Sequence, residues 1–160
     1  MRFKMVEAET LFELLHMEIV TQMYSSNLKN AKVEAYTKLE KMGYRVGQSL
    51  IERFTRDTPR FKDELEMLRF ICKDFWMKIY KKQVDSLKTN HQGVYVLQDE
   101  NFKLLSKISK ERDFTEEARK LLAFPCGIIC GSLAGLGLSA TVTVDVSSMP
   151  ACKFTVQIRK

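Results

Sequence analysis

Residues 121–144 read LLAFPCGIICGSLAGLGLSATVTV, and no charged side chain interrupts them. The stretch is long enough for a transmembrane helix. However, it contains Pro125 and four glycines, and its last third alternates apolar and polar residues as a half-buried strand does. We interpret it as a buried helix of a soluble core that leads into a strand; a membrane span and a peripheral membrane insertion are the alternatives. Gly127, Gly131 and Gly135 lie four residues apart and form a small-residue ridge suited to close packing.

The alternation continues beyond this stretch and predicts a sheet. Residues 139–146 and 152–158 both alternate, and the turn 147–150 separates them, so they predict one hairpin. Residues 93–97 and 102–105 flank a polar turn and predict a second hairpin. Four strands with one apolar face imply an antiparallel sheet covered by helices on that side. The predicted fold class is therefore α+β, with N-terminal helices and one later helix packed on a four-stranded antiparallel sheet.

The first predicted helix covers residues 9–24 and follows a tail, residues 1–8, that we expect to be disordered. Its apolar side chains occupy nearly the whole circumference. A surface helix of a single domain needs only one apolar stripe, so the second apolar side indicates contact with another chain. His16 lies among these apolar residues and is predicted to be a core or interface residue.

The second predicted helix runs from about Lys32 to Thr55 and has one apolar seam. Gly43 and Gly47 lie inside it, where each glycine costs about 1 kcal/mol relative to alanine. The close approach of another backbone would explain both glycines. A third helix is predicted after Thr58, with acidic residues in its first turn and lysines at its C-terminal end, as the helix dipole favours.

Composition bounds the class of protein. The 160 residues form one domain, 1–160, and an apolar fraction of 45% excludes a disordered chain. Lys and Arg number 26 against 20 acidic residues, for a net charge of +6. This excess falls short of the dense basic stripe of a nucleic-acid-binding protein, so no nucleic-acid partner is expected. The four cysteines lack Cys-x-x-Cys spacing and no apolar secretory signal begins the chain, which favours reduced thiols in the cytosol.

No residue pattern predicts catalysis. Residues 135–140 (GLGLSA) match the glycine string of dinucleotide-binding sites, but the predicted order of helix, glycines and strand is the reverse of what phosphate binding needs. His16 and His91 are too few for a histidine-based metal site, and His91 is expected in a turn. No cysteine has a basic neighbour that would favour its thiolate. We therefore predict no catalytic, cofactor-binding or metal-binding residue, no cofactor, and a protein that is not an enzyme.

Four segments, in order, resemble the TRAPP small-subunit family. Residues 42–53 (MGYRVGQSLIER) are similar to its Gly-x-Arg-[Val/Ile]-Gly-x-x-Leu-x-Glu signature. Residues 70–76 (FICKDFW), 89–99 (TNHQGVYVLQD) and 146–154 (VSSMPACKF) resemble one particular subunit type of that family. The resemblance extends from about Leu11 to the C terminus. It is specific because the four segments occur together and in sequence.

The resemblance implies helices packed on an antiparallel sheet and a non-catalytic scaffold role in a vesicle-tethering complex. That complex acts between the endoplasmic reticulum and the Golgi and promotes nucleotide exchange on a Rab GTPase. Family members pair through their first two helices, and this subunit type forms a heterodimer with the member that carries a buried acylated cysteine. The implied location is cytoplasmic, peripheral at the cis-Golgi and the endoplasmic reticulum, with a peripheral membrane contact left open. Residues 57–60 contain no cysteine where the acylated member has one, so no lipid site is carried over.

Both lines of reasoning place the partner on the first two helices. We predict that Gly47→Leu abolishes pairing and leaves the isolated fold mostly intact, because a side chain there would separate two close backbones. One alternative is a lipid or small-molecule carrier with an apolar cavity between the glycine-ridge helix and the sheet. A second is an enzyme that uses Cys126 or Cys130. The predicted interface residues are Leu11, Leu15, Ile19, Leu39, Gly43, Val46, Gly47 and Leu50.

Overall fold

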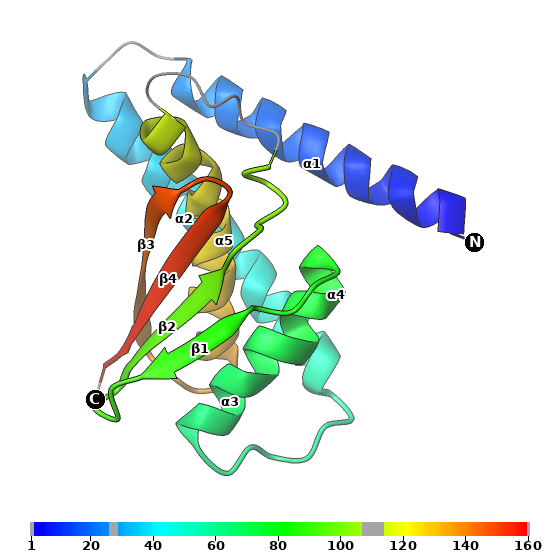
Figure 1. Cartoon of the computed structure of the whole chain (residues 1–160), viewed down its shortest axis with the longest axis vertical. Helices are drawn as coiled ribbons and strands as arrows, with labels where there is room; N and C mark the ends of the chain where they lie inside the picture. Colours follow the sequence, from blue (N-terminus) through cyan, green and yellow to red (C-terminus); the bar gives the residue numbers. More distant parts are fainter. Residues whose placement is uncertain (1, 26–28, 107–113, 160) are drawn as a thin grey trace.

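The computed structural model describes residues 2–25, 29–106 and 114–159, and these form helices packed on one four-stranded sheet, which confirms the α+β prediction (Figure 1). Residues 26–28, between the first two predicted helices, lie outside this range. The elements in chain order are α1 (Arg2–Tyr24), α2 (Lys29–Thr55), α3 (Glu64–Phe70), the π-helical turn η1 (Ile71–Phe75), α4 (Trp76–Tyr80), β1 (Ser86–Thr89), β2 (Val94–Asp99), α5 (Phe114–Gly135), β3 (Ala140–Ser148) and β4 (Ala151–Ile158).

The sheet has the order β1-β2-β4-β3, and every neighbouring pair is antiparallel. The β3–β4 hairpin is confirmed, with Val142 opposite Val156 and Val144 opposite Phe154. Along β2 and β4, buried side chains alternate with half-buried ones, so one face of the sheet belongs to the core. That face lies against the helices, as the alternation predicted.

The prediction of a hairpin from residues 93–97 and 102–105 was wrong about one strand. β2 pairs with β1, which precedes it in the chain, and Leu87 lies opposite Leu97. Residues 102–105 instead form a turn in which Phe102 and Leu105 are fully buried. The Phe102 amide donates to the carbonyl of Pro150, which holds the turn against the β3–β4 hairpin. A short apolar run fills a core equally well as a strand or as a turn, and here long-range packing decided the outcome.

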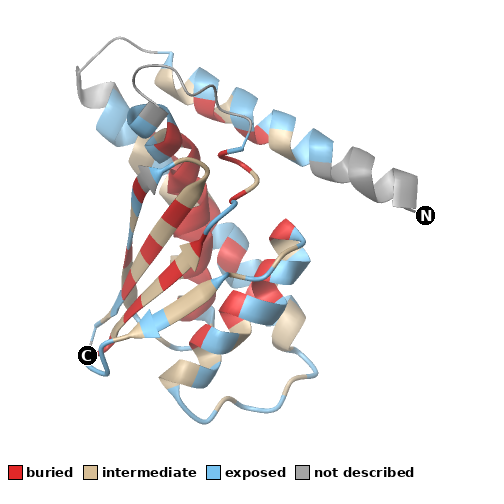
Figure 2. Cartoon of the chain, in the orientation of Figure 1, coloured by how far each residue is buried: buried red, intermediate tan, exposed pale blue. Residues whose placement is uncertain are grey.

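The uncharged stretch forms most of α5, which packs against β3 on one side and α2 on the other (Figure 1). In the described part of the chain, Thr115–Gly135 is the one helix long and apolar enough to cross a membrane. However, 72% of its most apolar window is buried inside the protein (Figure 2). This burial supports the interpretation of α5 as a core helix.

Glycines on α2 and α5 allow the two helices to touch backbone to backbone. A Cβ atom added to Gly43 would lie 2.1 Å from the carbonyl oxygen of Phe124, and one added to Gly127 would lie 2.0 Å from that of Glu40. Gly47 and Gly131 meet the opposite helix at similar distances. Since real Cβ atoms do not approach other atoms so closely, only glycine fits at these four positions. The glycines of α2 and the glycine ridge of α5 thus allow the two helices to pack closely against each other.

The third predicted helix and the turn at His91 are also confirmed. Asp63 caps α3 by accepting a hydrogen bond from the Glu66 amide at 2.7 Å, and Glu64 and Glu66 occupy the first turn. α3 continues through η1 into α4, whose C-cap residue Lys81 has a left-handed φ of 59°. His91 has the same φ in the turn between β1 and β2.

Candidate partner interface

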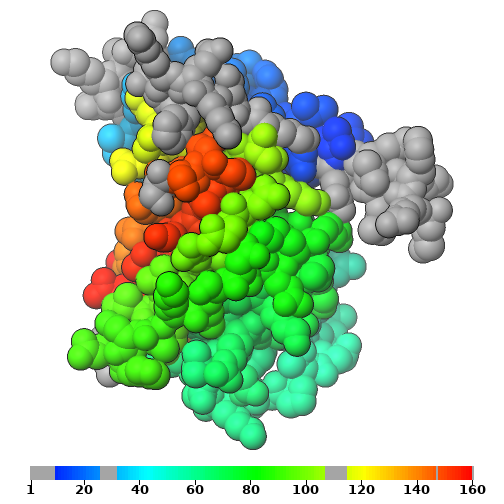
Figure 3. All heavy atoms as spheres, viewed as in Figure 1, coloured from blue at the N-terminus to red at the C-terminus, as the bar shows by residue number. Residues whose placement is uncertain are grey.

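Helix α1 packs on the rest of the molecule through only part of its surface. Val20 belongs to a small buried cluster with Leu39 of α2 and with Leu121 and Ala123 of α5. The helix begins at Arg2, within the range that was expected to be a disordered tail, and its N-terminal half extends beyond the body (Figure 1). The blue spheres of α1 lie at the upper right edge of the molecule (Figure 3). The packed residues therefore anchor the C-terminal half of α1.

Three exposed leucines lie on the side of α1 that faces away from the body, with Glu18 among them. Leu11, Leu14 and Leu15 are 68%, 56% and 60% exposed, although leucine normally contributes to cores. His16 and Val20, on the opposite side, are buried. The helix is therefore apolar on two sides, as its sequence predicted, and one of these sides has no partner among the described residues. An exposed apolar patch of this kind is typical of a protein–protein contact.

Five of the predicted interface residues are exposed or half-buried. Leu11 and Leu15 are exposed on α1, and Val46 is 38% exposed on α2. Ile19 and Leu50 are half-buried, Ile19 beside the α1 cluster and Leu50 against the main core. These five residues stay in the predicted interface, which remains a prediction.

Three of the predicted interface residues lie inside this chain rather than on its surface. Leu39 is fully buried, and Gly43 and Gly47 contact the backbone of α5 rather than open surface. The inference that another backbone comes close was correct, but that backbone belongs to the same chain. Gly47→Leu would therefore disrupt the fold before it affected any partner. Spacing alone indicates close approach and does not identify the approaching helix.

Four exposed apolar residues were missed as interface candidates: Phe12, Leu14 and Met17 on α1 and Val33 near the start of α2. Val33 is 72% exposed. The three α1 residues could have been predicted from the sequence, because they are apolar residues of a helix that is apolar around its circumference. No sequence pattern marked Val33 as an interface residue.

The structure also isolates His16, which is 4% exposed and has no hydrogen-bond partner at either ring nitrogen among the described residues. Its ring is parallel to that of Phe12, with centroids 6.2 Å apart, and lies 5.4 Å from the ring of Phe124. Burial lowers the pKa of His16 to about 4, so the imidazole is neutral at neutral pH. The burial of His16 inside this chain agrees with its prediction as a core or interface residue.

Two cavities lie between α1, α2 and α5. The smaller has a volume of about 50 Å³ and lies beside His16, with Phe12, Ile19 and Met42 also lining it. The larger has about 330 Å³ and lies near the start of α2, where a 2.8 Å ion pair joins Lys32 to Glu116. Neither lies between α5 and the sheet, where the carrier alternative placed its ligand, and the glycine ridge of α5 faces α2.

The cysteines are free thiols in protected surroundings. Burial raises the pKa of Cys72 and of Cys126 to about 12, and it also raises the pKa of half-buried Cys130. The Cys130 thiol donates a weak hydrogen bond to the Ala140 carbonyl at 3.3 Å. Since the thiolate is the reactive form, these environments favour structural cysteines over a nucleophile.

We expect Cys72 and Cys126 of the folded protein to react with an alkylating reagent at pH 8 more than about a hundredfold slower than in denaturant, because raised pKa values and burial both suppress the thiolate. Cys130 should react first, since it is the one half-buried thiol of the four. Mass-spectrometric peptide mapping over time measures each rate. Labelling of Cys126 at the rate of the denatured chain would restore the thiol-enzyme alternative.

The sequence profile of the Transport protein particle (TRAPP) component family matches residues 12–159. This chain belongs to the TRAPP family. Trafficking protein particle complex subunit 6B of Homo sapiens is 57% identical over 155 residues, which cover 95% of this chain and 98% of that protein. Subunit 6A of Bos taurus is 46% identical over 153 residues, which cover 94% and 96%. These similarities confirm the resemblance to subunit 6 and make the chain a subunit of the TRAPP complex, with other TRAPP subunits as partners.

Among solved structures, the TRAPP fold is matched by trafficking protein particle complex subunit 3 from Naegleria fowleri, which is covalently bound to palmitic acid. The TM-score is 0.80, and the match covers 96% of each chain at 17% identity. This likeness confirms the fold of the TRAPP chain described above.

Proposed function

We propose that this chain is a non-catalytic scaffold subunit that forms a heterodimer with another TRAPP small subunit through α1 and the exposed side of α2. In this proposal the partner is the type with a buried acylated cysteine, and the chain acts as a single domain. The assembled complex, located in the cytoplasm and peripherally at the cis-Golgi and the endoplasmic reticulum, then acts in ER-to-Golgi transport. The chain supports Rab nucleotide exchange by that complex without supplying catalytic residues.

The observation that carries the proposal is the apolar outer face of α1. Leu11, Leu14 and Leu15 are its most exposed leucines, and Val46 is a further exposed apolar residue, on α2. A helix that keeps three leucines in water loses the free energy that their burial would provide, about 1.5–3 kcal/mol for each side chain. A partner helix that covers this face would recover it. The face thus favours a subunit contact over a solvated helix.

The absence of a cysteine in the loop before α3 supports a partner of the acylated type. The loop before α3 contains no cysteine, so the chain has no thiol at the place where the resemblance puts the acyl group. The subunit 3 protein of Naegleria fowleri carries palmitic acid covalently. A pair of one acylated and one unacylated small subunit is therefore the arrangement that we propose.

Light-scattering chromatography of the chain with an acylated-type subunit tests the pairing. We expect a stable one-to-one complex, and we expect the double variant Leu11→Glu/Leu15→Glu to weaken it by at least about a hundredfold, because binding would bury two carboxylates in an apolar contact. Circular dichroism should show an unchanged fold, since both side chains are exposed.

The matched control is Thr143→Glu/Gln157→Glu, which adds the same two charges to exposed positions on β3 and β4. This variant should bind like the original chain. A wild-type chain that remains a monomer in the presence of the partner would refute the pairing. Equal loss of binding in both double variants would show that net charge, rather than the α1 face, controls the association.

A further inference from the structure

Strand β3 forms a long open edge of the sheet. It has nine residues, ends the strand order β1-β2-β4-β3, and pairs with β4 alone among the described strands (Figure 1). The opposite edge strand, β1, has four residues and carries the exposed Lys88, and shortness and lysine both protect an edge from further pairing. β3 contains no lysine or proline, and its one charged side chain is Asp145. Its register is regular from Ala140 to Asp145 and shifts after that point.

Two backbone hydrogen bonds show which way the residues of β3 face. The Arg159 amide donates to the carbonyl of Ser139 at 2.8 Å, so this pair faces inward between β4 and β3. The Ile158 amide donates to the carbonyl of Gly93 at 2.8 Å, on the β2 side. In an antiparallel sheet, successive residues of a strand turn their N–H and C=O groups to alternate sides. Ile158 therefore faces β2, and Ala140 opposite it faces the open edge.

The same alternation turns the N–H and C=O groups of Val142 and Val144 toward the open edge. No described residue hydrogen-bonds to these groups, whereas the Ala140 carbonyl accepts the weak bond from the Cys130 thiol. The side chain of Val144 lies on the helix side of the sheet, opposite Phe154, yet it is only half-buried. A further strand along β3 would supply the backbone hydrogen bonds and cover Val144.

We propose that residues 140–145 of β3 bind an extended segment of another TRAPP subunit, which adds a fifth strand to the sheet. The backbone of that segment exchanges hydrogen bonds with Val142 and Val144, which gives affinity without a deep pocket. Its alternate side chains are apolar on the helix side, where they continue the core beside Val144. On the other side they are polar, beside the exposed Thr143 and Asp145.

This subunit is distinct from the one proposed to bind α1. β3 runs along the left side of the molecule in Figure 1, whereas α1 extends across the top toward the right. The two surfaces are therefore separate, and one can be occupied while the other is free. The inference requires membership of the TRAPP complex, and it does not depend on the proposed α1 pairing.

Val144→Pro tests the edge directly. Proline removes an N–H that the pairing with β4 does not use, so the isolated chain should keep its fold, as circular dichroism would show. The variant is tagged and co-expressed with the other TRAPP subunits, and quantitative mass spectrometry measures each subunit recovered with it. We expect one subunit to fall by about tenfold or more, because proline removes a hydrogen bond and its ring obstructs an added strand. The subunit bound at α1 should be retained.

Val144→Ala is the matched control. It also shortens the side chain but keeps the N–H, so the recovery of every subunit should stay within about threefold of wild type. Equal loss with both variants would show that the valine side chain, rather than the backbone edge, holds the subunit, and would overturn the proposal. Recovery of all subunits with Val144→Pro at wild-type levels would overturn it as well.

Hydrogen exchange of the wild-type chain decides the question even if Val144→Pro fails to fold. In the isolated chain, the Val142 and Val144 amides should exchange at least about a hundredfold faster than the Thr143 amide, which faces β4. In the complex, both valine amides should become protected. Fast exchange of both amides in the complex would overturn the proposal. Protection in the isolated chain, together with a dimer mass in light scattering, would identify a second copy of this chain as the added strand and overturn the assignment to another subunit.

Discussion

Gly43→Val is expected to unfold the protein rather than to weaken a subunit contact. A Cβ atom at Gly43 would lie 2.1 Å from the Phe124 carbonyl oxygen and 3.0 Å from the Ile128 amide nitrogen. Both atoms are backbone of α5, which cannot rotate away as a side chain can. The helices would have to separate along their length, so we expect the free energy of unfolding to fall by about 4 kcal/mol or more. Urea unfolding followed by circular dichroism measures the change.

The matched control for this variant is Arg45→Val, two residues along the same helix. Arg45 is exposed, and valine there brings the same β-branched side chain into the same helix. This control should cost about 1 kcal/mol or less. If the two variants unfold at similar urea concentrations, α2 and α5 do not touch at Gly43. The same contact argument applies to Gly127→Val, where the added atom would lie 2.0 Å from the Glu40 carbonyl oxygen.

Asp99→Ala should cause the second large loss of stability. The carboxylate of Asp99 is fully buried, and it accepts hydrogen bonds from the Trp76 indole at 3.1 Å and from the Lys82 ammonium at 2.5 Å. It also accepts from the backbone amide of Asn101. Burial of Lys82 acts to lower its pKa, but the hydrogen bonds to Asp99 and Asp85 hold that pKa above its usual value.

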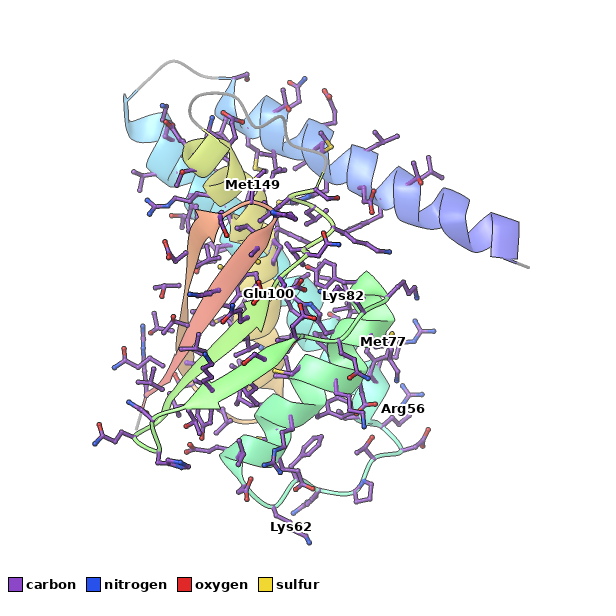
Figure 4. All side chains as sticks on the ribbon, in the orientation of Figure 1. Arg56, Lys62, Met77, Lys82, Glu100 and Met149 are labelled. Atoms are coloured by element: carbon purple, nitrogen blue, oxygen red, sulfur yellow. The ribbon has the colours of Figure 1, made fainter. Side chains whose placement is uncertain are left out.

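Removing Asp99 would leave the fully buried Trp76 indole without an acceptor and Lys82 with one carboxylate in place of two. Figure 4 shows Lys82 beside Glu100, where the end of α4 meets the end of β2, so the loss would loosen the junction between helix and sheet. We expect a cost of about 3 kcal/mol, the lower end of the range for breaking a buried ion pair, because Lys82 keeps some access to solvent. Thermal and urea unfolding both measure it.

Asp85→Ala is the control for this second variant. Asp85 binds the same ammonium at 2.9 Å, but its side chain is 43% exposed. Water can replace an exposed carboxylate, so we expect a cost of about 1 kcal/mol or less. A similar cost for the two alanine variants would show that the pair at Asp99 is no stronger than a surface ion pair. Neither change lies on α1, so partner binding by the folded fraction should be unaffected.

Much of the fold could be predicted because its signals are local. The alternation in residues 139–146 and 152–158 depends on neighbouring residues only. The β3–β4 turn falls at Met149 and Pro150, inside the predicted turn 147–150, because β3 continues through Ser148. The run 102–105 was misassigned because four residues are too few to separate a strand from a buried turn. β1 is a four-residue edge strand with one half-buried leucine, so it carried little apolar pattern of its own.

For the candidate interface, the sequence by itself determined that the first helix is apolar on two sides and that the second helix meets another backbone at Gly43 and Gly47. It also identified the TRAPP family, since that resemblance depends on residue identity and order. Only the tertiary structure shows which backbone packs against Gly43 and Gly47, and that both ring nitrogens of His16 lack a partner among the described residues. The physical reason is that helix periodicity and residue size are properties of the local chain. The contacts of Gly43 with Phe124, and of His16 with Phe124, join α5 to segments far earlier in the sequence, and packing of the whole chain selects them.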